Sequence, residues 1–138
     1  MTEPIKLPTR HVFVYGTLRR GESNDITRLA PAPRFVGLGE VVGTMFDLGP
    51  YPGVLLGASA PEGGQGTVVG EVYAISAALE AVLDAIEEVY PQATGEYTKR
   101  SIDVLAAGRS WECIVYEINP LRTAGRPVVA GGDWVISR

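Results

Sequence analysis

The chain has 138 residues, of which 46% are hydrophobic and 20% are charged, and this composition is typical of one folded domain rather than of a disordered chain. The net charge of -4, with Lys and Arg scattered along the sequence, offers no clustered basic face for a nucleic-acid partner. One cysteine and one histidine exclude an intramolecular disulfide and a Cys-rich zinc site, so we expect no metal centre within the chain.

The N-terminus predicts a simple domain organisation. Residues 1–10 are expected to be an extended lead-in, because Pro4 and Pro8 disfavour a helix, and residues 11–138 are expected to form a single domain. The lead-in has no apolar run of the length that a signal peptide or a membrane span requires. We therefore expect a soluble, cytoplasmic protein without a membrane partner, whose oligomeric state the sequence leaves open.

The first predicted strand is the aromatic and β-branched run Val12–Tyr15. Gly16 interrupts this run, and a short helix is expected to begin at Ser23 or Asn24. A strand that ends in a tight glycine turn leaves backbone N–H groups without ladder partners, and such groups can line a small hollow that binds anions. This hollow is the candidate substrate site. His11 begins the strand without a visible partner and is not expected to take part in catalysis.

Apolar runs farther along the chain predict the rest of a sheet. Residues 35–48 are expected to form one long, bent strand or two strands joined at a bulge, because glycines punctuate the run. Further strands are expected at residues 54–56, 67–75, 97–105 and 111–118, with a flexible hairpin tip at 61–66. About six or seven strands beside one strong helix predict an α+β fold, whose sheet can curl into a barrel.

The one strong helix is predicted over Ala77–Glu88, with Ser76 as its N-cap. Its single apolar face consists of Leu79, Val82, Leu83 and Ile86. At about 100° per residue, Glu87 lies roughly 90° from the centre of that face, on the boundary between core and solvent. Glu88 and Asp84 are expected to project toward water.

Glu87 therefore has two interpretations. A carboxylate on the boundary can be partly desolvated, which raises its pKa toward the range useful for proton transfer. A carboxylate on a solvated helix flank would have no such role, and periodicity alone favours this simpler interpretation. A structure separates the two, because only the first places the carboxyl group in a cavity beside the Gly16 turn.

A series of short motifs occurs in a fixed order between residues 11 and 136. They are Val12–Gly21, Tyr51–Gly53, Gly70–Tyr73, Leu83–Glu87, Tyr97 with the basic pair Lys99–Arg100, and Gly132–Trp134. Together they resemble the γ-glutamylcyclotransferase-like superfamily, which includes the small AIG2-like and γ-glutamylamine cyclotransferase-like proteins. A lone Tyr-Gly-Thr-Leu would be a weak match, whereas the ordered set covers nearly the whole chain.

The resemblance implies a mixed β-barrel with helices around it and a cavity lined by the Tyr-Gly-Thr-Leu turn. Carried over to this sequence, the substrate-binding turn is Tyr15, Gly16, Thr17 and Leu18, and the catalytic residue is Glu87. The implied reaction is that of a γ-glutamyl cyclotransferase: the α-amine of a γ-glutamyl amide attacks the γ-carbonyl, and 5-oxoproline and a free amine are released. Glu87 would be the general acid and base, without a metal or a cofactor.

Other residues carry weaker hypotheses. Tyr97 matches the family and either helps to shape the substrate-binding pocket or is a buried barrel tyrosine. Arg19 is expected to be an exposed loop residue rather than a carboxylate ligand. Tyr51–Gly53 is expected to be a structural turn rather than a contact, and Cys113 is expected to be an inert core residue. The link 88–96 directly follows the helix and is predicted to border the pocket and to help select the leaving amine.

Two other classes of function stay open. A binding module would keep the cavity and recognise a small carboxylate-bearing or γ-glutamyl ligand without turnover. Glu87 argues against it, because a simple carboxylate site would not place a second carboxylate nearby. An interaction protein would use the apolar surface at residues 50–56. The sequence offers little support for this class of function. The sequence also leaves open which γ-glutamyl compound is the substrate and which substrate group the turn amides bind.

Overall fold

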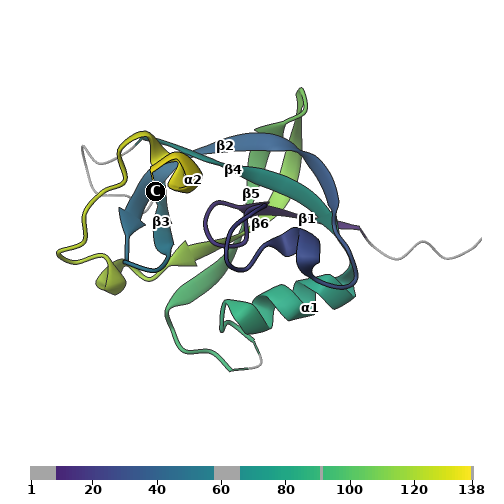
Figure 1. Ribbon diagram of the computed structural model, residues 1–138, viewed down its shortest axis with the longest axis horizontal. Coiled ribbons are helices and arrows are strands. Elements are labelled where there is room, and N and C mark those ends of the chain that lie inside the picture. The colour runs from purple at the N-terminus through teal and green to yellow at the C-terminus, as the bar shows by residue number, and fades with distance from the viewer. Residues whose placement is uncertain (1–8, 58–65, 91, 138) are drawn as a thin grey trace, which may run out of the picture.

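The computed structural model describes residues 9–57, 66–90 and 92–137, and within them six strands form one sheet (Figure 1). The strands are β1 (Arg10–Val14), β2 (Arg34–Asp47), β3 (Pro52–Leu56), β4 (Gly66–Ile75), β5 (Tyr97–Ala106) and β6 (Arg109–Ile118). Their order is β3-β2-β4-β1-β6-β5, and β2 also pairs with β5, so five strands close into a barrel while β3 extends the sheet outside it. β1 and β6 run parallel and the other pairs run antiparallel, which confirms the predicted α+β fold with a mixed barrel.

Short helices lie between the strands and after the last of them. They are η1 (Ile26–Arg28), α1 (Ala77–Ile86), η2 (Pro120–Arg122), η3 (Ala130–Gly132) and α2 (Trp134–Ser137), where η denotes a 3-10 helix. α1 lies along one side of the barrel, and α2 lies toward the end of the barrel that carries β3 (Figure 1). The segment before α2 runs beside β2, because the Asp47 N–H donates to the Pro127 carbonyl and the Val129 N–H to the Met45 carbonyl, each at 2.8 Å.

Two apolar layers explain why β1 is hydrophobic at successive positions. Phe13 belongs to the core cluster inside the barrel, together with Tyr15 and the indole of Trp134. Val12 and Val14 belong to a second cluster, which the apolar face of α1 covers. Because side chains alternate across a strand, a strand that is buried on both faces has a continuous apolar run. The turn that follows β1 therefore starts from a strand whose last three residues, Val12 to Val14, are buried.

β2 is one continuous strand that bends, which is the first of the two predicted possibilities. A register shift between Phe35 and Gly37 marks a bulge in its pairing with β4. Glycine lets neighbouring chains approach β2 closely: a Cβ atom at Gly39 would lie 2.8 Å from Val104 Cγ1. The bend allows β2 to pair with β3, β4 and β5, and so to close the barrel.

The N-terminus of α1 forms as the sequence predicts, but one polar residue of the helix, Asp84, lies in an environment that the sequence did not predict. Ser76 is the N-cap, and its Oγ accepts the Leu79 N–H at 3.1 Å. The prediction that Asp84 projects toward water was wrong: its carboxylate is buried and accepts hydrogen bonds from the Tyr116 hydroxyl at 2.8 Å and the Lys99 ammonium at 3.0 Å. These partners compensate for the desolvation of Asp84 and join α1 to the barrel.

The C-terminus of α1 lies two residues earlier than predicted. Ile86 is the last helical residue, Glu87 is the C-cap, and Glu88 has a φ of 56°. The Val89 N–H donates back to the Asp84 carbonyl at 3.0 Å. A left-handed residue with this backbone hydrogen bond is a Schellman motif, in which glycine is the usual residue. The helical wheel therefore applies as far as Glu87 and not to Glu88.

Two local predictions have mixed outcomes. The helix expected from Ser23 or Asn24 is only the single turn η1, and its N-cap is Asp25. The hairpin of β5 and β6 was predicted, and it turns at Ala107–Gly108, where both residues have positive φ as this short turn type requires. The lead-in predicted for residues 1–10 and the hairpin tip predicted at 61–66 lie almost entirely outside the described residues.

Candidate active site

A cavity of about 310 Å³ opens at the end of β1, where the chain turns. All six site residues predicted from the sequence line it: Tyr15, Gly16, Thr17, Leu18, Glu87 and Tyr97. Tyr51, Pro52 and Tyr116 also line the cavity without having been predicted as site residues, and Glu88 and Glu96 belong to the link that was predicted to border it. The structure thus brings the turn after β1 and the C-terminus of α1 to one cavity, although about 70 residues separate them in the sequence.

The backbone donors of the turn after β1 fall into two groups. The N–H groups of residues 19–22 are all bound within the chain; for example, the Arg20 N–H donates to the Glu71 carboxylate at 2.9 Å. The N–H groups of residues 16–18 donate to no acceptor in the part of the chain that the structure describes. Adjacent free N–H groups on a cavity wall are suited to binding an anion.

Gly16 has no room for a side chain. A Cβ atom at this position would lie 2.6 Å from Cγ of Pro52, and a proline ring cannot rotate away. Pro52 is the first residue of β3, so the turn and β3 meet at the cavity edge. Tyr51–Gly53 was predicted to be a structural turn rather than a contact; in the structure Pro52 and Gly53 begin β3, and Tyr51 and Pro52 both line the cavity.

Glu87 is partly buried in the cavity wall. Burial raises its pKa from 4.5 to about 7, and the nearby carboxylates of Glu96 and Glu88 contribute to the increase. No side-chain donor among the described residues reaches its carboxyl group. A carboxyl group with a pKa near neutrality can both accept and donate a proton at physiological pH. Of the two interpretations of Glu87, the structure thus supports the partly desolvated carboxylate.

Four tyrosines line the cavity, and each hydroxyl group already donates to an acceptor within the chain. The bonds run from Tyr15 to the Tyr116 carbonyl (2.6 Å), from Tyr116 to Asp84 (2.8 Å), from Tyr97 to the Pro52 carbonyl (2.9 Å) and from Tyr51 to Glu96 (2.5 Å). Burial is the main cause of a raised pKa at Tyr15, Tyr97 and Tyr116. The hydrogen bond to Glu96 is the main cause at Tyr51, whose pKa rises to about 12. These phenols are therefore poor proton donors near neutral pH, unlike Glu87.

The link 88–96 borders the cavity through its two end residues, as the sequence predicts. Glu88 is exposed to solvent, but it also contributes to the cavity wall, which the helical wheel did not predict. Glu96 accepts the Tyr51 hydroxyl. Among the described lining residues there are three carboxylates, those of Glu87, Glu88 and Glu96, and no Lys, Arg or His. The ionisable side chains on the described cavity wall thus include no basic group.

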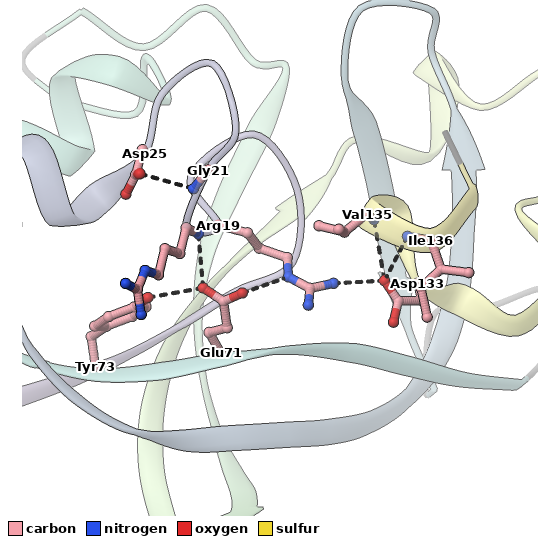
Figure 2. A network of polar contacts seen from close by, with 9 residues as sticks. Arg19, Gly21, Asp25, Glu71, Tyr73, Asp133, Val135 and Ile136 are labelled. Atoms are coloured by element: carbon pink, nitrogen blue, oxygen red, sulfur yellow. Dashed lines mark hydrogen bonds and ion pairs between the residues drawn. The ribbon is translucent and has the colours of Figure 1, made fainter.

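Arg19 is buried, so the prediction of an exposed loop residue was wrong. Its Nε donates to Glu71 at 2.9 Å and its Nη1 donates to Asp133 at 2.8 Å, as Figure 2 shows. The guanidinium group thus pairs with two carboxylates of the chain itself. The structure shows Arg19 as a support of the turn after β1 and not as a residue that lines the cavity.

Two residues that the sequence analysis set aside lie outside the cavity. Cys113 is fully buried, which raises its pKa to about 12 and agrees with an inert core thiol. His11 packs against Trp111, with ring centroids 4.7 Å apart. Across the described ranges, no His, Cys, Asp and Glu side chains are grouped so as to hold a metal ion. Nor does any helix in these ranges have the length and apolar character needed to cross a membrane.

The fold and the cavity define a small barrel protein in which a free carboxyl group and free backbone amides line one pocket. A family model described as "Gamma-glutamyl cyclotransferase, AIG2-like" matches residues 12–136. The chain therefore belongs to the AIG2-like gamma-glutamyl cyclotransferase family.

Individual relatives agree with this assignment. A Vibrio cholerae protein, whose name assigns it provisionally to the gamma-glutamylcyclotransferases, is 37% identical over 131 residues, which cover 89% of this chain and 93% of the relative. The gamma-glutamylcyclotransferase family protein YtfP of Escherichia coli K12 is 30% identical over 131 residues, 90% of this chain and 95% of its own length. The crystal structure of a mouse AIG2-like protein superposes with a TM-score of 0.67 at 27% identity, covering 86% of this chain and 84% of the mouse chain.

Proposed function

We propose that this protein is a γ-glutamyl cyclotransferase, which releases 5-oxoproline from a γ-glutamyl amide with Glu87 as general acid and base. One observation carries the proposal: Glu87 lies on the cavity wall without a hydrogen-bonding side chain among the described residues, and its pKa is raised to about 7. Free backbone amides line the same cavity. Membership of the family supports the reaction class.

In the proposed reaction, the α-ammonium group of the substrate first loses a proton to the Glu87 carboxylate. The neutral amine then attacks the γ-carbonyl carbon, so that a C–N bond forms and the carbonyl oxygen becomes an oxyanion. Collapse of this intermediate breaks the bond to the leaving amine, to which Glu87 delivers its proton. The attacking nitrogen releases its second proton to water as the ring forms, and the departing amine takes up a second proton from water. Each nitrogen therefore exchanges two protons overall, the net charge is conserved, and Glu87 returns to its starting state.

The free N–H groups of residues 16–18 are assigned to the α-carboxylate of the substrate. This group is fully charged, whereas the oxyanion exists only in the intermediate. The described cavity wall carries the carboxylates of Glu87, Glu88 and Glu96 and no cationic side chain. The backbone amides are then the groups with which a substrate carboxylate can form favourable hydrogen bonds. Binding at the turn would fold the substrate so that its amine approaches its own γ-carbonyl, which favours ring closure.

The direct test is incubation of the protein with a panel of γ-glutamyl amines, γ-glutamyl amino acids and γ-glutamyl peptides. We expect 5-oxoproline and the free amine to appear in equal amounts from at least one of these classes. Both products are measured by chromatography against a control without protein. Binding without product for every compound would contradict the proposal and would support a binding module of the same fold.

The charge of the leaving amine is expected to affect the rate, because Glu88 and Glu96 line the cavity without ion pairs in the described part of the chain. Three γ-glutamyl amides of equal chain length, ending in an ammonium, a methyl or a carboxylate group, should react with kcat/KM decreasing in that order. At low salt we expect about a 5- to 30-fold difference between the first and the last.

Glu96→Gln provides the matched test of this selectivity. The substitution removes one charge and retains an oxygen for the Tyr51 hydroxyl, so the difference between the three amides should narrow. It should also move the acidic limb of the pH–rate profile to lower pH, because the Glu96 charge raises the pKa of Glu87. Equal rates for all three amides in the wild-type protein would contradict charge selection.

A further inference from the structure

We propose that Glu71 is a positioning residue for the substrate-binding turn, and that Asp133 in the C-terminal segment supports it through Arg19. The Glu71 side chain would hold the turn after β1 so that the amides of residues 16–18 stay available to the cavity. This inference rests on the proposed function, in which those amides bind the substrate carboxylate. Neither Glu71 nor Asp133 lines the cavity, so both would act through the backbone of the turn.

Glu71 binds the backbone of the turn directly. Its Oε1 accepts the Arg20 N–H and the Tyr73 hydroxyl, each at 2.9 Å, and its Oε2 accepts Arg19 Nε at the same distance (Figure 2). Arg20 lies only two residues after Leu18, the last of the free amides. Glu71 itself lies within β4, which pairs with both β1 and β2 at this position. A rigid strand therefore fixes the turn through a buried carboxylate.

Asp133 holds the outer end of the Arg19 side chain. Its Oδ1 accepts Arg19 Nη1 at 2.8 Å and also accepts two N–H groups of α2 (Figure 2). The flanking residues fix Asp133 in place. Gly132 lies so close to β4 that a Cβ atom there would be 1.9 Å from the Thr67 carbonyl oxygen, and Trp134 is buried in the barrel core. The C-terminal segment therefore contributes to the support of the turn, although its residues do not line the cavity.

The energetics favour a turn with one conformation. The side chains of Arg19, Glu71 and Asp133 are 7%, 8% and 17% exposed, so their charges are largely removed from water. Movement of the turn would separate buried charges, which is strongly unfavourable. Apolar side chains in place of these three charged ones would cover β4 with a smaller cost of desolvation. A carboxylate that binds a backbone N–H adds directionality, which apolar packing lacks. We infer that the polar network is suited to orienting the turn.

The test measures ligand binding at the turn itself. In the isotope-labelled wild-type protein, 5-oxoproline should shift the NMR signals of the Gly16, Thr17 and Leu18 amides. The same ring without the carboxylate, 2-pyrrolidinone, should not shift them. Glu71→Gln keeps an oxygen for the Arg20 N–H but removes the negative charge opposite Arg19. It should weaken 5-oxoproline binding by about 3- to 30-fold and reduce the amide shifts at saturation.

Glu117→Gln is the matched control. Glu117 is also buried, with Oε1 on Arg100 Nε at 3.0 Å and Oε2 on the Leu56 N–H at 2.8 Å, but it does not line the cavity or contact the turn after β1. The Glu117→Gln protein should be less stable than the wild-type protein but should bind 5-oxoproline with the same affinity. If Glu71→Gln does not fold, Asp133→Asn provides the test, because it removes one charge next to Arg19 and keeps the oxygen that caps α2. Unchanged affinity and shifts in a folded Glu71→Gln or Asp133→Asn protein, or an equal loss in Glu117→Gln, would overturn the inference.

The same measurements separate this inference from the proposed function. A wild-type protein that binds 5-oxoproline at the amides of residues 16–18 but produces none from any γ-glutamyl compound would contradict the function only. A protein that produces 5-oxoproline while these amide signals do not respond to it would contradict the positioning role and the assignment of the amides to the substrate carboxylate, but not the reaction. The inference is supported when the amides respond in the wild-type and Glu117→Gln proteins and the response is reduced in Glu71→Gln.

Discussion

Glu87→Gln is expected to lower the rate of 5-oxoproline release by about 10²- to 10⁴-fold, because a glutamine amide can neither accept nor return the transferred proton. Glutamine has nearly the same shape as glutamic acid, so the cavity and the turn after β1 should be retained. We therefore expect the loss mainly in kcat, with a smaller change in KM. Steady-state kinetics on one γ-glutamyl substrate, together with circular dichroism to confirm folding, measure this effect.

Glu88→Gln is the matched control, because it changes the neighbouring glutamate in the same way. The Glu88 side chain is exposed, and a hydroxyl from Thr94 approaches its carboxylate at 3.3 Å. The Glu88→Gln protein should therefore keep most of the wild-type kcat. A Glu87→Gln protein with nearly normal kcat, or a Glu88→Gln protein that is folded and inactive, would show that the acid–base group is a different one.

The parts of the site that could be predicted from the sequence are those that local interactions determine. The β-branched run before Gly16 defines a strand and the place where it ends. The N-cap Ser76 and the apolar spacing after it define the helix and its buried face. Glu87 retains helical backbone angles, with φ of -84° and ψ of 0°, so the helical wheel placed it correctly on the boundary between core and solvent.

Contacts between distant segments could not be predicted in the same way. Arg19 is separated by 52 residues from Glu71 and by 114 residues from Asp133, and nothing in the local sequence pairs them. An arginine after a glycine turn is usually exposed, so the simpler prediction was wrong here. Asp84 shows the same limit: the wheel shows that it lies off the apolar face, but not that Tyr116 reaches it from β6.

The cavity residues that the sequence analysis missed also depend on closure of the barrel. Tyr116 belongs to the alternating pattern of β6, which indicates burial but not which part of the strand faces α1. Tyr51 and Pro52 carry turn chemistry, and turn chemistry describes the backbone rather than what the side chains contact. Glu96 belongs to the link 88–96, which was predicted to border the pocket, but the link has no periodicity that singles out Glu96 within it. These residues reach the cavity because β6 pairs with β1 and because the starts of β3 and β5 lie beside the turn after β1, which the local sequence does not encode.

The free energy of unfolding should depend on pH through Glu87. In the folded protein the pKa of Glu87 is about 7, whereas an unfolded glutamate has the ordinary value of 4.5. Between these values the folded protein binds one more proton than the unfolded chain, so stability falls as the pH rises through this range. The difference in pKa corresponds to about 3 kcal/mol. Glu87→Gln cannot ionise, so relative to wild type it should gain stability by about 2 to 3 kcal/mol between pH 4.5 and pH 8.

Denaturant unfolding of both proteins at several pH values measures this gain. Glu112→Gln is the control, because Glu112 is an exposed glutamate on β6 that does not line the cavity. The stability of the Glu112→Gln protein should change with pH in parallel with that of the wild-type protein. Parallel curves for Glu87→Gln and the wild-type protein would mean that Glu87 ionises as freely in the folded state as in the unfolded chain. A carboxyl group of that kind would be a weaker base, and it would be less able to take the proton from the substrate ammonium group in the first step of the proposed reaction.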